Sequence, residues 1–325
     1  MDVVEESSRN PEITMKKACD MIELNPDRYY RRRARYKDAG LDGLTDRTCE
    51  PHTVAHRILP EEKQLVIAYA KEESYADFRH RKLAYQLQNH DIVFVSPSTT
   101  YRILKEAGLI KSWSLPAKNN ADGKMEITKP NQVWHTDITY VPVRESHYYL
   151  ISVLDAYSRY IVHAELSYSM TAKDVSRVVA QALENAGIED HDHAPALISD
   201  NGVQLTAKRF QELLRRFGVE HRRTAVRHPE SNGKIEVFHK TLKYEHVYLQ
   251  DRYESFLQAK QDIERFITLY NTKRLHQAIA YVTPEQRYTG GDKEILEERQ
   301  RKHRLAKQRR REANRTGDVK VNSVA

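Results

Sequence analysis

Three carboxylates stand at positions of this sequence where acidic side chains are uncommon. Asp137 interrupts the β-rich string WHTDITYV, and Asp200 directly follows the apolar string PALIS. Glu236 lies one turn into a predicted helix whose N-cap is Ser231 or Asn232. A lone carboxylate inside a strand costs several kcal/mol unless it is paired or binds a metal ion. These residue types therefore raise the question of a metal site.

Asp200 also has a simpler explanation. Asp-Asn-Gly is ordinary turn chemistry, because these residues tolerate left-handed backbone and hydrogen-bond their own main chain. The 35 residues between Asp200 and Glu236 decide nothing alone, since a chain with 46 acidic residues contains many Asp…Asp…Glu triples. Asp200 is either only a turn residue or also a metal ligand. The elements that carry the three acids, and the sequence strings around them, must decide between the two.

The elements around the acids predict a mixed sheet. Three β-rich runs separated by short polar turns, QVWHTDITYVPV, HYYLISVLDAY and YIVHAELSY, indicate an antiparallel meander. The amphipathic helix TAKDVSRVVAQALENAG, the strand PALIS, the helix TAKRFQELLRRFG, the strand VEHRRT and the Glu236 helix follow in that order. Three paired strands followed by alternating helices and strands indicate an α/β fold, and the order resembles the ribonuclease-H-like fold.

The segment 13–44 predicts two short helices with a break at Asn25-Pro26 and an end at Gly40. A helix, a tight turn and a second helix rich in Arg and Tyr are the outline of a helix-turn-helix, whose second helix enters the major groove. On this interpretation four arginines contact DNA phosphates or base edges: Arg28, Arg31, Arg32 and Arg35. A solvated basic helix is the alternative.

A second helical unit is predicted from 60 to 110. Its third helix, in SPSTTYRILKEAGLI, is expected to be capped at Ser98 and closed by Gly108. The N-terminal end of this helix is where a recognition helix would contact DNA. The DNA-binding candidates there are Thr99, Thr100 and Arg102.

Charge and composition favour an intracellular protein with a polyanionic partner. The net charge is +7, and residues 299–325 alone carry ten Lys and Arg against two acidic residues. No run of about 18 apolar residues exists and the N-terminal residues are polar, so we expect neither a membrane span nor a secretory signal. Two cysteines suit a reducing cytosol, and the expected location is the cytoplasm.

The strings around the three acids carry a family resemblance. WHTDITYV, SDNGVQLT and HPESNGKIEVFHKTLKYE resemble the signatures of the retroviral integrase superfamily. Within it they are similar to bacterial insertion-sequence transposases, the Asp-Asp-Glu class whose last two acids are 35 residues apart. YNTKRLHQAIAYVTPEQRY resembles the segment that closes that catalytic domain. The resemblance is strong over 113–290 and looser over the helical region before it.

The resemblance implies a polynucleotidyl transferase that cleaves transposon ends and transfers the freed 3′-hydroxyl into target DNA. It implies that Asp137, Asp200 and Glu236 are the catalytic residues and hold two Mg²⁺ ions, with Mn²⁺ able to substitute. It also implies that Lys240 and Lys243, further along the Glu236 helix, contact phosphates of the transposon end. A solvated lysine is the alternative, more so for Lys240.

The predicted chain has five parts and acts on double-stranded DNA. The five parts are a helix-turn-helix unit at 1–56, a second such unit at 57–112, a linker at 113–128, an integrase-like core at 129–290 and a basic C-terminal tail at 291–325.

The expected partners are transposon terminal inverted repeats, target DNA and a second copy of the chain, because two ends must be joined. The rivals are an integrase of a phage-like or retroelement DNA, and a DNA-binding regulator with a silent core. The complete acid triad argues against the regulator.

Overall fold

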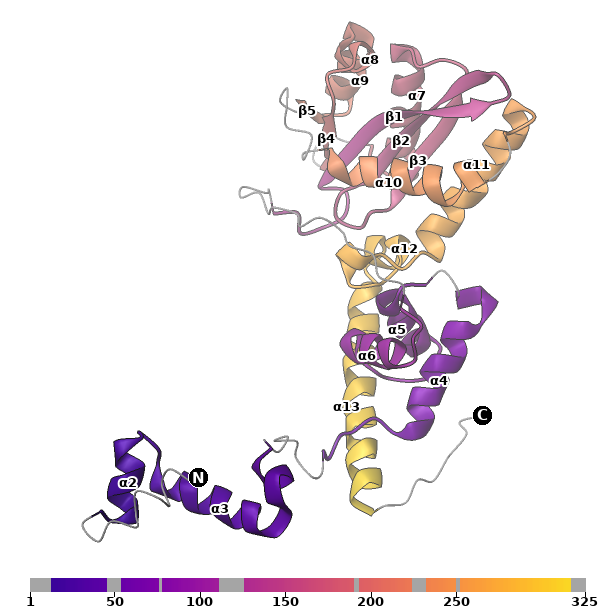
Figure 1. The fold of residues 1–325 in the computed structure, drawn as a ribbon. Helices are drawn as coiled ribbons and strands as arrows, with labels where there is room; N and C mark the ends of the chain where they lie inside the picture. The colour runs from indigo at the N-terminus through magenta and orange to yellow at the C-terminus, as the bar shows by residue number, and fades with distance from the viewer. Residues whose placement is uncertain are drawn as a thin grey trace. The chain divides into compact units, whose positions relative to one another are not determined.

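The computed structural model of the chain describes residues 13–45, 54–75, 78–110, 126–189, 193–223, 232–249 and 252–316. The chain divides into two compact units, Met1–Ala55 and His56–Ala325, shown in Figure 1. Most of the predicted linker, residues 113–125, lies outside the described residues.

The first unit contains the two predicted helices, α2 (Met15–Met21) and α3 (Pro26–Ala39), followed by the short helix η1 (Gly40–Leu44). Asn25 caps α3, because its side chain accepts hydrogen bonds from the backbone amides of Asp27 and Arg28 at 2.9 and 3.3 Å. Gly40 ends the helix with φ and ψ of 61° and −143°, a backbone conformation open to glycine because it has no Cβ. The core is small and consists of Ala18, Cys19 and Tyr29.

The second unit begins with three helices packed on one apolar core. They are α4 (Pro60–Lys71), α5 (His80–Asn89) and α6 (Pro97–Glu106), with the short η2 (Glu73–Tyr75) after α4. The predicted cap of α6 at Ser98 is wrong. Ser96 is the N-cap and accepts from the amide of Thr99 at 3.2 Å, because Pro97 occupies the first helical position and leaves Ser98 inside the helix.

A five-stranded sheet with the order β3-β2-β1-β4-β5 forms the centre of the second unit. Its strands are β1 (Val133–Val143), β2 (Ser146–Asp155), β3 (Ile161–Ser167), β4 (Ala196–Ser199) and β5 (Glu220–Arg223). The first three strands pair antiparallel, whereas β4 pairs parallel to β1 and β5 parallel to β4. This is the predicted meander followed by parallel strands, and the ribonuclease-H-like prediction is confirmed.

Helices cover both faces of this sheet (Figure 1). One face packs against α7 (Ala172–Asn185), α8 (Val203–Thr206) and α9 (Lys208–Arg216), with Trp134, Ile151 and Val153 in the shared core. The other face packs against α10 (Gly233–Glu245) and α11 (Phe256–Thr272) through two further clusters. The helix predicted at TAKRFQELLRRFG is observed as α9, and Ala207, with the extended φ and ψ of −61° and 143°, separates it from the short α8.

The C-terminal segment is helical where a basic tail was predicted. After η5 (Val247–Leu249) and α11 come η6 (Gln277–Ile279), α12 (Pro284–Tyr288) and the 25-residue α13 (Asp292–Thr316). The segment predicted as a basic tail contains α13, and this helix bonds to the α4–α6 helices through buried arginines. None of the described helices is long and apolar enough to cross a membrane.

Candidate active site

Asp137 lies on the central strand β1 and is clamped by a histidine from α10. Its Oδ2 is 3.3 Å from Nδ1 of His239, and the two side chains are 22% and 6% exposed. Nε2 of the same ring lies 3.2 Å from Oγ of Ser152 on β2. Because a carboxylate only accepts hydrogen bonds, we assign a proton to Nδ1 of His239. The imidazole therefore holds the Asp137 carboxylate in one orientation.

Asp200 follows the last residue of β4, beside the β1 segment that carries Asp137. The parallel ladder pairs Val133 with Ala196, and the pairs advance together along the two strands. Continued at the same register, it brings Asp200 level with Asp137 on strands that lie about 4.8 Å apart. Oδ1 of Asp200 accepts from the amide of Gly202 at 3.0 Å, so the predicted turn role is confirmed.

The N-terminal end of α10 is also bonded to β1. Oδ1 of Asn232 lies 3.1 Å from Nδ1 of His135, and the Asn232 side chain makes no capping bond to its own helix. Burial lowers the pKa of His135 to about 4, and the nearby Lys234 ammonium adds to the shift. His135 is therefore neutral at pH 7 and serves as a fixed contact between strand and helix.

Glu236 lies on the side of α10 that is turned toward β1. It is four residues after Asn232 and three residues before His239, which places the three side chains on one helical stripe. Both neighbours on the stripe contact β1, so the half-exposed Glu236 faces the strand that carries Asp137.

Lys243 continues this stripe, whereas Lys240 does not. Lys243 is half-buried, and burial lowers its pKa while the Asp137 carboxylate acts in the opposite direction. The two charges therefore interact. Lys240 is exposed, and only one of the two predicted lysines is directed toward the acids.

The side chains of Asp137, Asp200 and Glu236 do not form a complete metal-binding site in this structure. Among the described residues, no three His, Cys, Asp or Glu side chains form a group that could hold a metal ion. The sheet register aligns Asp137 with Asp200, and α10 turns Glu236 toward β1. Three carboxylates are nonetheless the hard oxygen donors that Mg²⁺ prefers, so the chemistry of this set fits that ion.

Asp155 is a fully buried acid with a structural role. Its Oδ2 accepts from the amide and hydroxyl of Ser158 at 2.8 and 2.6 Å, and its Oδ1 accepts from the amide of Asn131 at 2.9 Å. Burial raises the pKa of this carboxyl, although the hydrogen bonds oppose the shift. Asp155 thus organises the turn after β2.

The four candidate arginines of α3 are not equivalent. Arg28 and Arg31 are exposed, whereas Arg32 and Arg35 are half-buried. The guanidinium of Arg35 donates to the carbonyl of Thr45, and this bond holds the end of η1 against α3. Arg28 and Arg31 are the better placed of the four for contacts with DNA.

The candidates on α6 include one error. Thr100 is fully buried and its hydroxyl donates to the carbonyl of Ser96 at 3.2 Å, so a direct DNA contact by Thr100 is contradicted. Thr100 lies on the side of α6 that faces the core of these helices. Arg102 is exposed, and Oγ1 of the half-buried Thr99 lies 3.4 Å from the Arg102 guanidinium. These two residues keep an outward position.

The sequence interpretation missed the contacts made by His239, Asn232 and Ser152. A signal was present for the first two, because they lie on the same helical stripe as Glu236. Nothing in the sequence marks Ser152, which lies in an apolar strand and meets α10 only through the tertiary packing.

Three family models match the chain. Residues 127–229 and 217–284 each match an integrase core domain, and residues 28–104 match a homeodomain-like domain. The first two matches contain the three acids between them, and the third covers α3 to α6.

Two curated relatives are transposases. The transposase for insertion sequence element IS904 of Lactococcus lactis subsp. lactis (strain IL1403) is 34% identical over 178 residues, which are 54% of this chain and 68% of the relative. The putative transposase InsK for insertion sequence element IS150 of Escherichia coli (strain K12) is 29% identical over 170 residues, 52% of this chain and 58% of that one.

Similar solved structures come from viral integrases. The HTLV-2 integrase catalytic core domain in complex with magnesium (trimeric form) is 20% identical with a TM-score of 0.40, over 49% of this chain and 97% of that chain. The simian T-cell lymphotropic virus intasome in complex with PP2A regulatory subunit B56 gamma is 18% identical with a TM-score of 0.44. This match covers 63% of this chain and 70% of that chain. At these TM-scores the likeness carries no weight, and the fold rests on the strand order described above.

Proposed function

The chain belongs to the family of insertion-sequence transposases that carry an integrase core domain, and we propose that it cleaves DNA at the ends of a mobile element and joins those ends to target DNA. The observation that carries the proposal is the stripe of α10 that faces β1. It brings Glu236 and His239 over the strand that bears Asp137, while the β1–β4 register aligns Asp200 with it.

The three acids Asp137, Asp200 and Glu236 would hold divalent metal ions, with Mg²⁺ as the physiological ion, Mn²⁺ as a substitute and two ions per site. When bound, such ions stabilise the charge on the attacking and leaving oxygens of a phosphodiester. The chain itself contributes the carboxylates and their orientation, which His239 fixes for Asp137.

The reaction needs no nucleophilic side chain. In the first step water attacks the phosphorus at the end of the element, the bond to the 3′ oxygen breaks, and a 3′-hydroxyl and a 5′-phosphate are released. In the second step that hydroxyl attacks a phosphodiester of the target, a new phosphorus–oxygen bond forms, and the target's own 3′ oxygen leaves. Lys243, on the same stripe of α10 as Glu236 and His239, would hold a neighbouring phosphate of the element's end.

The helical parts supply DNA recognition in this proposal. The exposed arginines of α3 and the exposed end of α6 are assigned to the terminal inverted repeats of the element. Two ends must be joined in one event, so the active species contains at least two copies of the chain. The reaction takes place in the bacterial cytoplasm, on the nucleoid.

A cleavage assay tests the proposal. The inverted repeats that flank the gene are made as end-labelled duplexes and incubated with the purified chain and Mg²⁺ or Mn²⁺. We expect a cut at the repeat boundary and joining of the labelled end to plasmid DNA, both abolished by EDTA and by Glu236→Gln. Glu189→Gln is a matched control, because Glu189 is an exposed carboxylate outside the site. Equal turnover by the Glu236→Gln variant would contradict the proposed site.

A further inference from the structure

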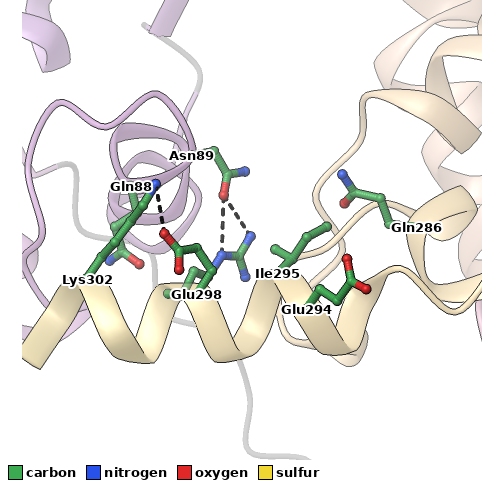
Figure 2. Close-up of a pocket in the computed structure, with 8 residues that line it drawn as sticks. Gln88, Asn89, Gln286, Glu294, Ile295, Glu298 and Lys302 are labelled. Atoms are coloured by element: carbon green, nitrogen blue, oxygen red, sulfur yellow. Dashed lines mark hydrogen bonds and ion pairs between the residues drawn. The ribbon is translucent and has the colours of Figure 1, made fainter.

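One arginine of α13 connects the α4–α6 helices to the catalytic core. Arg299 is only 7% exposed, and its Nε and one terminal nitrogen donate to Oδ1 of Asn89 at 3.3 and 2.9 Å. Figure 2 labels Asn89 and marks the two bonds that its side chain accepts with dashed lines. The guanidinium also donates to the carbonyls of Ala280 and Tyr281 at 2.8 and 2.7 Å. A single side chain therefore bonds the end of α5 and the loop before α12.

The loop that Arg299 holds has an uncommon backbone. Ala280 and Tyr281 have φ values of 59° and 57°, so two adjacent residues with a Cβ occupy the left-handed region. This conformation persists when surrounding contacts over-determine it. The carbonyls of both residues accept from Arg299, and the ring of Tyr281 stacks on Tyr85 of α5 at a centroid distance of 4.5 Å. The strained loop is thus held by α13 and α5 together.

A second set of contacts attaches α13 to the same helical unit. Arg310 is 6% exposed, and its Nε lies 2.8 Å from Oε2 of Glu62 on α4. Arg310 also donates to the carbonyl of Phe94 at 2.7 Å, and Lys302 pairs with Asp91. These contacts span three turns of α13, so the helix and the α4–α6 unit form one body.

A hollow lies on one side of Arg299. It has a volume of about 490 Å³ and lies between the end of α5, α12 and α13, bordered by Asn89, Gln286, Ile295 and Arg299 itself. The bonds of Arg299 to Asn89, Ala280 and Tyr281 cross between these segments beside the hollow.

We propose that Arg299 is a positioning residue that holds the α4–α6 unit at a constant distance from the catalytic core. The proposal rests on the proposed function, in which the α4–α6 unit binds the terminal repeat and the core cuts at its boundary. Successive phosphates of one strand are about 3.4 Å apart along the DNA axis, so a small swing of the unit would shift the cut by a nucleotide. Arg299 then determines which phosphate is cleaved, without touching the DNA.

The cleavage test removes each partner of the Arg299–Asn89 contact in turn. Arg299→Ala and Asn89→Ala each remove one partner, and Arg301→Ala is the matched control, because Arg301 is exposed and pairs with Glu298 on its own helix. We expect the two interface variants to bind the repeat within twofold of the parent, to cut at neighbouring phosphates as well, and to lose about tenfold in yield at the correct one. The double variant should resemble Arg299→Ala, because Arg299→Ala already removes the bond to Asn89. Cleavage at a single phosphate with parental yield would overturn the proposal.

Hydrogen exchange gives a readout that does not depend on activity. The amide of Tyr281 donates to the carbonyl of His276 at 3.0 Å, within the loop that Arg299 holds. Exchange at 276–282 should accelerate in Arg299→Ala, which loses the bonds to the loop. Exchange at the end of α5 should accelerate in Arg299→Ala and in Asn89→Ala, and Arg301→Ala should change neither. Unchanged exchange would overturn the proposed attachment even in a chain that cleaves DNA. Failure of the parent to cleave would instead contradict the proposed function, and the exchange result would still decide the role of Arg299.

Discussion

Nδ1 of His239 lies 3.3 Å from Oδ2 of Asp137, and the opposite nitrogen of the ring lies 3.2 Å from the Ser152 hydroxyl. The imidazole therefore connects α10 to two strands and orients one of the three acids proposed to be catalytic. A buried ring with both nitrogens engaged has little freedom to move. His239 is in this way a positioning residue for Asp137.

Replacement of His239 should lower the rate and spare DNA binding. In His239→Ala the Asp137 carboxylate loses its partner and the buried Ser152 hydroxyl is left unpaired. We expect a loss of about 10- to 100-fold in single-turnover cleavage, the range typical of residues that orient metal ligands. Repeat binding, measured by mobility shift, should not change. Cleavage at the parental rate by a folded His239→Ala chain would show that Asp137 needs no such support.

Each of the three acids should be indispensable. Asp137→Asn, Asp200→Asn and Glu236→Gln remove a charged oxygen donor with little change of volume, so the chain should fold and still bind the repeat. Cleavage and strand transfer should both fall below detection with Mg²⁺, in the end-labelled assay. Turnover by any one of them would remove that residue from the predicted set.

The two lysines of α10 provide a matched pair. Lys243 is half-buried beside Asp137, whereas Lys240 is exposed on another side of the helix. Lys243→Ala should weaken capture of the element's end and slow both chemical steps, because a positioning charge is lost, and Lys243→Arg should keep most activity. Lys240→Ala should change little. Equal effects of the two alanine variants, in affinity and in rate, would mean that the stripe is not the DNA face.

The outward face of α13 should contribute affinity without sequence preference. Arg304, Lys307 and Arg311 are exposed at helical spacing, and none of them forms an ion pair within the described chain. Replacing the three by Gln should weaken binding to repeat and random DNA alike. Each lost phosphate contact should reduce the slope of log K against log salt by about 0.9. An unaltered slope would assign this face a different role.

The inward face of α13 should instead contribute stability. Arg310→Ala leaves the mostly buried Glu62 carboxylate without its partner, although Glu62 still accepts from the amide of Leu59 at 3.0 Å. We expect a loss on the order of 2 kcal/mol in the free energy of unfolding, measured with urea. Arg309→Ala, at an exposed neighbouring position, is the control. A loss as large in the control would point to helix propensity rather than to the ion pair.

The sequence alone determined the features that depend on neighbours along the chain. The β-rich runs that form β1, β2 and β3, the amphipathic pattern of α7 and the Asn25-Pro26 break before α3 are local, and all were predicted. The Asp200 turn and the Asp155 turn follow from the same local chemistry. The strings around the acids identified the family because they are short and contiguous.

Only the tertiary structure decided which side chains meet across long separations and which faces are buried. His239 and Asp137 make contact because α10 lies on β1, and no periodicity in either segment encodes that packing. Thr100 was predicted at a DNA surface and is buried, since a helix pattern does not say which side its neighbours cover. Arg310 looked like part of a solvated tail, but its acceptor Glu62 lies 248 residues away. A charge in a sequence has no partner until the chain folds and brings one within hydrogen-bond distance.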